Sequence, residues 1–313
     1  MTDVGVVLPA TSAAGASRYD VVASAGLAED LGFDSVWTVD HLAFRTGILE
    51  PVSVLAAVSA VTRRVGLGFS VLVGALRHPA WTAKQLASLQ VLSGDRVLLG
   101  VGVGGEYPAE WVAAGVPVEE RGSRTDALLD VLPALLSGRP ARLPAPWDAD
   151  VPALAPTGAM PPVWIGGRSA AAMERAAGHG DGWLGAWVSP ARFARRREHL
   201  CARARELGRA EPRAGIAALV HVDDRDPEHA RAEAARFVGL QYGPSAGPLL
   251  RHVIAGTGAE VAKGLAAFVA AGADQLVLMP AAAGYAAQYR RLAALLDEEP
   301  IVRGKGPVTW PSE

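Results

Sequence analysis

Two neighbouring residues, Asp40 and His41, place a carboxylate and an imidazole directly after the apolar run 35–39. That run, Ser-Val-Trp-Thr-Val, has the β-branched and aromatic composition that is typical of a buried strand. A turn at its end would ordinarily use Gly, Asn or Ser, whereas histidine ordinarily titrates near neutral pH and can give or take a proton. We expect either a proton-transfer pair here or a histidine whose ring simply caps a carbonyl group.

A second group of residues is suited to binding an anion. Gly166 and Gly167 end the apolar run 162–167, and Arg168 and Ser169 follow. Ser169 is a suitable N-cap for a helix. Exposed amides at a helix N-terminus attract phosphate, and Arg168 adds a full positive charge. The pattern favours a phosphate site over a plain capped loop.

The glycines of the run 96–104 satisfy G-x-G-x-x-G at Gly100, Gly102 and Gly105, which is the fingerprint of a dinucleotide-binding Rossmann unit. In that unit the glycines lie in the turn that opens a helix, whereas here they lie largely within an expected strand. Glycine also lets a flat ligand approach the backbone closely. We therefore expect Gly102 and Gly104 to lie against such a ligand.

Other polar residues follow two of the expected strands, 65–74 and 96–104. Glu106 and Glu110 are expected at the rim of the site, where either could also be only a surface acid. Arg77 and His78 precede Pro79, so Arg77 either presents its guanidinium to an anion or only precedes a helix that begins at the proline.

Eight apolar runs alternate with helical patterns along the chain. Parallel strands that are buried on both faces read as continuous apolar runs, and each parallel pair needs a crossover helix. Eight such units predict a closed (β/α)8 barrel of the TIM type rather than an open doubly wound sheet. The expected strands are 4–9, 34–40, 65–74, 96–104, 162–167, 181–187, 214–222 and 274–280, and the expected helices are 18–31, 51–64, 79–93, 123–138, 169–179, 190–208, 227–240, 258–271 and 285–296.

The chain is expected to form a single domain over residues 1–313, with insertions near 104–122, 139–161 and 241–257. The Pro-rich insertion 139–161 is not expected to be an interdomain linker, because the alternation resumes in phase behind it. In a barrel of this type the active site lies at the C-terminal ends of the strands. The acid, the histidine and the glycine segments described above would meet there.

The overall composition narrows the class of protein. Half of the 313 residues are hydrophobic, 20% are charged and the formal net charge is −2, so nothing favours binding to nucleic acid or to an anionic membrane. Arginines gather at 191–209, where we expect a solvated helix face because Glu198 and Glu206 interrupt them.

Cysteine, metal-ligand and targeting patterns are sparse. Cys201 is the one cysteine, so an intrachain disulfide is impossible, and no HExxH or Cys ligand set predicts a metal site. The start of the chain has no secretory pattern, and no apolar run reaches the roughly 18–20 residues of a membrane span. We expect a cytoplasmic protein.

Four stretches, taken in this order, resemble the luciferase-like superfamily of flavin-dependent oxidoreductases: 32–42, 68–104, 162–183 and 256–278. The resemblance covers nearly the whole chain. It implies a TIM-like barrel that binds FMN or the deazaflavin F420 at its mouth and performs hydride transfer or oxygenation.

The resemblance also implies roles for individual residues. His41 is similar to the histidine that lies over the reactive edge of F420 and serves in proton transfer, with Asp40 orienting it. The Ser70–Val71 bond matches a non-prolyl cis peptide that supports the ring from behind. Glu106 matches, with a one-residue shift, an acid that follows the fourth-strand glycines in F420-dependent dehydrogenases.

Further positions match the family's phosphate-binding residues. Gly166, Gly167, Arg168 and Ser169 match the segment near the cofactor phosphate, and Arg124 resembles a phosphate-contacting arginine of the luciferases. The lysines that bind a sugar phosphate in one subgroup have no match. The aromatic residues expected at the mouth indicate an apolar or aromatic-friendly substrate pocket: Phe44, Trp111, Trp187 and Tyr242.

Three functions follow from these observations. The first is F420-dependent hydride transfer to or from a small organic substrate. The second is an FMN-dependent monooxygenase that receives reduced FMN from a separate flavin reductase. The third is a non-catalytic accessory barrel subunit, which the intact Asp-His and Gly-Gly-Arg-Ser features disfavour. A homodimer is implied by the resemblance alone.

Overall fold

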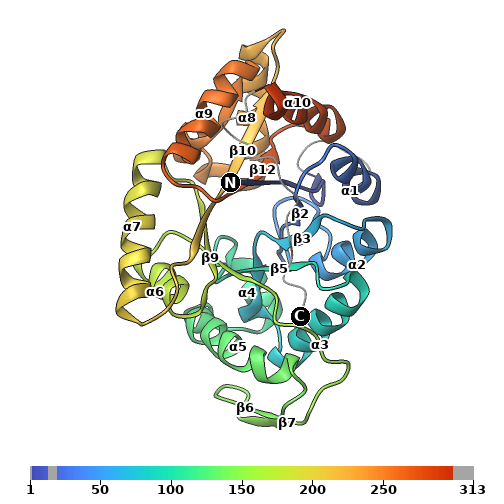
Figure 1. Ribbon diagram of the computed structural model, residues 1–313, viewed down its shortest axis with the longest axis vertical. Coiled ribbons are helices and arrows are strands. Elements are labelled where there is room, and N and C mark those ends of the chain that lie inside the picture. The colour runs from blue at the N-terminus through green and yellow to red at the C-terminus, as the bar shows by residue number, and fades with distance from the viewer. Residues whose placement is uncertain (1, 13–19, 299–313) are drawn as a thin grey trace.

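The computed structural model of the protein describes residues 2–12 and 20–298, and its centre is a closed barrel of parallel strands (Figure 1). The sheet runs β10-β12-β1-β2-β3-β5-β8-β9, and β9 pairs back to β10, which closes the ring. The predicted (β/α)8 barrel is confirmed. The strands of the ring are β1 (Asp3–Val7), β2 (Ser35–Thr38), β3 (Gly66–Phe69), β5 (Val97–Gly102), β8 (Val163–Gly166), β9 (Gly182–Ala186), β10 (Arg213–Val222) and β12 (Gln275–Pro280).

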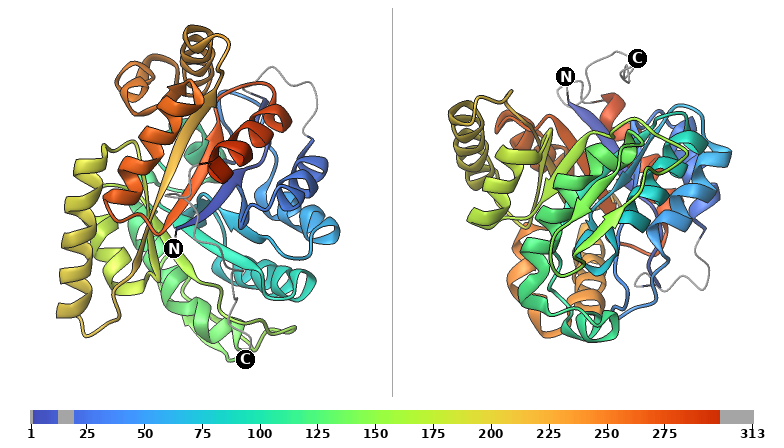
Figure 2. Two further views of the ribbon diagram at one scale, coloured as in Figure 1. Left: turned by 45° about the horizontal axis from the view of Figure 1, so that its top comes forward. Right: turned by 90° about the horizontal axis from the view of Figure 1, so that it is seen from below.

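Helices surround this ring, as the views of Figures 1 and 2 show. Several of them begin at a proline, whose fixed φ suits the first helical position and whose missing N–H costs nothing there. The expected helix 18–31 begins at Val21, and its first two expected positions lie outside the described residues. The helices are α1 (Val21–Asp30), α2 (Pro51–Val61), α3 (Pro79–Ser93), α4 (Pro108–Ala114), α5 (Arg121–Leu136), α6 (Ala170–His179), α7 (Pro190–Glu206), α8 (Pro227–Tyr242), α9 (Gly258–Ala270) and α10 (Tyr285–Glu298).

Two hydrophobic layers follow from the alternation of side chains along each strand. On β2, Val36 packs toward the helices, and Trp37 packs with Trp164 and the other residues of a small cluster inside the barrel. A Cβ on Gly68 would lie 2.2 Å from the Trp37 ring, and one on Gly182 would lie 2.4 Å from the Trp164 ring. The glycines therefore make room for two indoles that fill the barrel below its mouth.

The expected strand 65–74 is divided in two. It leaves the barrel ladder after Phe69, the Ser70–Val71 peptide is cis, as the resemblance implies, and Leu72–Val73 forms a separate short strand, β4, against β5. A single 3-10 turn, η2 (Gly74–Leu76), then leads to α3. The residues at this break lie at the C-terminal end of the barrel.

The three insertions carry regular structure of their own. The first, 104–122, contains the short helix α4 and a turn η3 (Val118–Glu120), and the second, 139–161, contains an antiparallel hairpin of β6 (Ala141–Leu143) and β7 (Ala149–Val151). The third, 241–257, contains η4 (Gly243–Ser245), η5 (Gly247–His252) and β11 (Ile254–Gly256), which pairs with β10. Within residues 2–12 and 20–298, no helix combines the length and apolar character needed to cross a membrane.

Candidate active site

A cavity of about 270 Å³ opens at the C-terminal ends of the barrel strands. It gathers residues that are far apart in the sequence, because parallel strands all end at this face. The predicted catalytic and cofactor residues that line it are Asp40, His41, Ser70, Val71, Gly102, Gly104, Glu106, Gly166, Gly167 and Arg168.

The His41 imidazole is held from two sides. Its Nδ1 lies 3.1 Å from Oε2 and 3.2 Å from Oε1 of Glu110, and its ring stacks on Phe44 at 4.1 Å with an interplanar angle of 12°. The backbone N–H of Leu42 donates to the same carboxylate at 3.2 Å. In the described part of the chain the hydrogen bonds of this ring are made at Nδ1, which leaves Nε2 open to a ligand.

Glu110 was expected at the rim, and this expectation is wrong because its side chain is fully buried. The first turn of α4 directs it inward beneath His41, whereas Glu106 is exposed and lines the cavity. The sequence carried no signal for this pairing, since α4 is only seven residues long and lies 69 positions from the histidine.

The Asp40 carboxylate is hydrogen-bonded to the backbone of β4 and to an arginine side chain. It accepts a hydrogen bond from the Val73 N–H at 2.9 Å and one from Arg77 Nη2 at 2.9 Å. Burial raises the pKa of Asp40, against the opposing effects of the Arg77 charge and the Val73 hydrogen bond. Asp40 thus ties the β4 segment to the end of β2, and the hydrogen-bonding partner of His41 is Glu110. Arg77 forms its second ion pair with Glu50, at 3.2 Å.

Gly102 and Gly166, which form the floor of the cavity, leave space for the side chain of Val71. A Cβ on Gly102 would lie 2.4 Å from Val71, and one on Gly166 would lie 2.7 Å from it. The clearance predicted for a flat ligand is therefore taken first by Val71, which itself lines the cavity. Around Val71 this surface is glycine backbone, which has no side chains that protrude. Such a surface is suited to a planar ring that lies across it.

The Gly-Arg-Ser segment lies at one end of this floor. Gly167 has a φ of +126°, and Ser169 caps α6 by accepting from the Ala172 N–H at 3.1 Å. Arg168 donates to the Trp187 carbonyl at 3.3 Å and lines both the mouth cavity and a larger cavity beside it. Ser169 lines only the larger cavity.

Arg124 lies elsewhere. Its Nε is 2.8 Å from Glu120 Oε2, and its guanidinium lies 5.0 Å from the centroid of the Trp147 ring. It is not among the described residues that line the mouth cavity. These contacts give Arg124 partners within the chain at the N-terminal half of α5.

Three of the four aromatic residues expected at the mouth line it: Phe44, Trp187 and Tyr242. Tyr242 meets Trp187 edge to face at 5.3 Å, and burial followed by the Glu106 charge raises the pKa of its phenol far above the usual value. Trp111 is instead buried against Val73 and Ala75 and is not among the described residues that line the cavity.

Gln241 is a lining residue that the sequence did not reveal. Its side chain is buried, and its Nε2 has no hydrogen-bond partner among the described residues. A buried donor without a partner is costly unless a ligand or water satisfies it. The wall of the cavity therefore holds an amide donor whose hydrogen bond is not made within the described residues.

The chain is similar in sequence to several known proteins. The chain is 34% identical over 192 residues to an uncharacterized protein of Mycobacterium tuberculosis, which is 59% of this chain and 66% of that one. It is 28% identical over 226 residues to 5,10-methylenetetrahydromethanopterin reductase of Archaeoglobus fulgidus, which is 70% of this chain and 65% of that one. The chain thus spans slightly less than two thirds of the length of these relatives.

Solved structures share the fold. An F420-dependent secondary alcohol dehydrogenase matches with a TM-score of 0.82 at 19% identity, over 97% of this chain and 99% of that chain. The monooxygenase RslO1 of Streptomyces bottropensis matches with a TM-score of 0.79 at 20% identity, over 95% and 98%. A match to the luciferase-like monooxygenase family extends over residues 2–275, and the chain therefore belongs to this family of oxidoreductases.

Proposed function

We propose that the protein is an F420-dependent oxidoreductase that transfers a hydride to or from a small organic substrate at the mouth of the barrel. The observation that carries this proposal is the imidazole of His41, held at Nδ1 by the buried carboxylate of Glu110 beside the Val71 floor. Hydride transfer to or from a carbonyl or imine carbon requires that a proton move as well. A fixed imidazole with a free nitrogen is suited to that task.

Relatives support the choice of F420. The chain is 47% identical over 90 residues to the F420-dependent glucose-6-phosphate dehydrogenase of Beutenbergia cavernae, which is 27% of each chain. When bound, F420 supplies a ring carbon that gives or takes a hydride, and its deazaflavin lacks the nitrogen at which flavins react with oxygen.

The chain's own residues would act as follows. Val71 and the surrounding glycines support one face of the ring, and the Gly167–Arg168 segment with the start of α6 receives the phosphate. His41 Nε2 exchanges the proton with the substrate, and Glu110 fixes the ring and stabilises its positive charge. Phe44, Trp187 and Tyr242 exclude water from the substrate, and Gln241 donates to its acceptor group.

The first experiment is a pair of fluorescence titrations of the protein with F420 and with FMN. Micromolar or tighter binding of F420 with weak binding of FMN is the expected result. Tight binding of FMN alone would instead favour a monooxygenase supplied by a flavin reductase, which the aromatic, water-excluding mouth would also suit. Binding of neither would favour the accessory-subunit hypothesis.

The variant His41→Asn then tests the proton role. Turnover should fall by roughly a hundredfold or more, which is the usual contribution of a positioned proton donor, while the Kd for F420 changes little. His229→Asn, an exposed histidine on α8, is the matched control. A His41→Asn enzyme that turns over like the parent would overturn the role of His41. A homodimer and a cytoplasmic location are further proposals, which gel filtration and fractionation of cells would test.

A further inference from the structure

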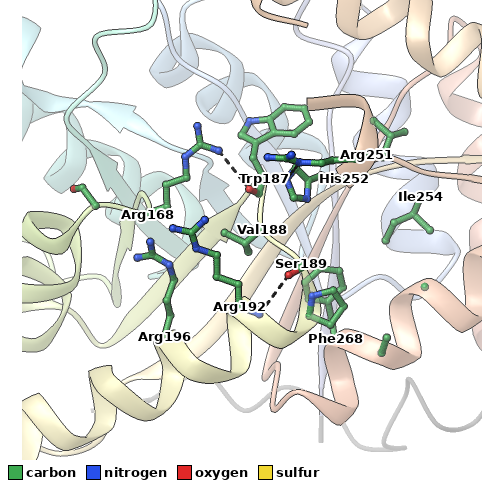
Figure 3. Close-up of a pocket in the computed structure, with 15 residues that line it drawn as sticks. Arg168, Trp187, Val188, Ser189, Arg192, Arg196, Arg251, His252, Ile254 and Phe268 are labelled. Carbon is green, nitrogen blue, oxygen red and sulfur yellow. Dashed lines mark hydrogen bonds between the residues drawn. The ribbon is translucent and has the colours of Figure 1, made fainter. Parts of the chain in front are cut away.

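The larger cavity beside the mouth has an excess of positive charge. It measures about 780 Å³, against about 270 Å³ for the mouth itself, and the two share Arg168 and Trp187. Figure 3 shows the guanidinium groups of Arg168, Arg192 and Arg196 directed toward the same space, with Arg251 and His252 approaching from η5.

Arg192 and Arg196, in the first half of α7, differ from two arginines near its end. Toward the end of α7, Arg203 is paired with Glu174 at 2.9 Å and with Glu206 at 2.8 Å, and Arg205 lies 3.3 Å from Glu211. Among residues 2–12 and 20–298, no carboxylate comes within the 4.0 Å of an ion pair for any of the four cavity arginines. The solvated helix face expected for 191–209 therefore holds for part of α7, but its first two turns face a cavity.

The positive charges of the cavity arginines also repel one another. Burial lowers the pKa of Arg196, and the charges of Arg192 and Arg168 lower it further. Burial likewise lowers the pKa of His252, together with Arg251, Arg168 and Arg192. The Nε of Arg196 is buried without a hydrogen-bond partner among the described residues. A cavity lined by several like charges attracts anions.

The N-termini of α6 and α7 add positive electrostatic potential to the same cavity. Ser169, the N-cap of α6, and Ser189, the N-cap of α7, both line the cavity, so two positive helix ends face it. A single phosphate monoester carries a charge of only about −1.5 to −2 near neutral pH. Four arginines and two helix ends exceed what one such group needs, so the cavity fits a ligand with several negative charges.

We infer that this cavity, lined by Arg168, Arg192, Arg196 and Arg251, binds a chain of carboxylates that extends from the phosphate end of the cofactor. This inference rests on the proposed function, since F420 carries glutamate residues beyond its phosphate and FMN ends at the phosphate. Because Arg168 lines both cavities, a ligand whose ring lies in the mouth can reach the second cavity past this residue. The arginines would select the extended cofactor over FMN.

The test compares three deazaflavin ligands by fluorescence titration: F420 with several glutamates, the form with none, and the ring with its ribityl chain alone. The glutamylated form should bind at least tenfold more tightly than the form without glutamates, with a steeper loss of affinity as salt increases. Arg192→Ala, Arg196→Ala and Arg251→Ala should each remove most of this difference and leave the affinity for the unglutamylated form unchanged. Arg195→Ala, an exposed residue on the same helix, should not.

Two results would overturn the inference and leave the proposed function intact: equal affinity for the forms with and without glutamates, or an equal loss of affinity for both in the arginine variants. An effect of Arg251→Ala on the KM of the substrate alone would assign the cavity to the substrate, which also overturns it.

If no deazaflavin binds, the proposed function fails and the cavity is judged by itself. Calorimetry with free tri-γ-glutamate then decides: binding that Arg192→Ala abolishes would support an oligocarboxylate site, and no binding would overturn it.

Discussion

The imidazole of His41 and the carboxylate of Glu110 lie 3.1 Å apart, although 69 positions separate them in the chain. The histidine follows β2 and the acid opens α4, an insertion behind β5. The pair therefore forms only when the insertion folds over the mouth, and it links the order of that insertion to the orientation of the candidate proton donor.

Glu110→Gln tests this link. The amide can still accept from the Leu42 N–H, but it removes the negative charge beside the imidazole. We expect kcat to fall by roughly ten- to a hundredfold with little change in the Kd for F420, because a positioning role acts on the proton transfer and not on cofactor contacts.

The matched variant is Glu106→Gln, which alters an exposed acid of the same insertion that lines the cavity. A large loss of kcat in Glu106→Gln together with normal turnover in Glu110→Gln would reverse the two roles and return to the acid first expected from the sequence.

Gly166→Ala should destabilise the floor of the mouth. The new Cβ would lie 2.7 Å from Val71 Cγ1, and overpacking of this kind costs about 1–3 kcal/mol. Gly178→Ala in α6, where the new Cβ would meet no described atom within 4 Å beyond its own helix backbone and chain neighbours, should instead leave stability unchanged or raise it by about 0.5–1 kcal/mol. Denaturant unfolding measures both.

Val71→Ala in the Gly166→Ala background provides the decisive comparison, because it removes the atoms that the new Cβ meets. If the double variant recovers none of the lost stability, contact with Val71 is not the reason for glycine at this position.

Arg77→Ala should lower the free energy of unfolding by about 2–3 kcal/mol, since it leaves the buried Asp40 carboxylate with one charged partner fewer. Adding Asp40→Asn to this variant should restore part of the loss, because the uncompensated charge is then removed. Arg139→Ala is the control, because within the described residues its side chain bonds to Ser137 alone. Additive effects of the two changes would contradict the proposed coupling.

His221 predicts a pH dependence of stability. Burial lowers the pKa of this β10 histidine, against the raising effects of the Ala281 carbonyl and of Glu233 and Asp223, while Arg291 lowers it further. The unfolded chain therefore takes up the proton first. As pH falls below about 6.5, the free energy of unfolding should drop by at most about 1.4 kcal/mol per pH unit, until the lower folded pKa is reached.

His221→Gln should reduce this slope below about pH 6.5 in denaturant titrations. It should not abolish the slope, because burial also lowers the pKa of His252. An unchanged slope in His221→Gln would show that the residue does not resist protonation in the fold.

The barrel itself could be predicted from local patterns. Each ring strand is a continuous apolar run, because both faces of a parallel strand are buried, and most helices are marked by a proline or a capping residue at their start. The predicted strand and helix positions agree with the observed ones to within a few residues, with the exception of the strand that divides at Ser70–Val71. The gathering of Asp40, His41, Gly102, Gly166 and Arg168 around one cavity followed from the same rule, since the C-terminal strand ends share one face.

What each of these residues contacts was decided by tertiary structure. The partner of His41 depends on how a seven-residue helix within an insertion packs, and no periodicity reports that. Val71 takes the space beside Gly102 and Gly166 because the chain leaves the ladder after Phe69. Arg192 and Arg251 come from segments that only the folded chain brings together, so the sequence did not indicate that they share a cavity. Local propensity acts over a few residues, whereas these contacts join segments tens of residues apart.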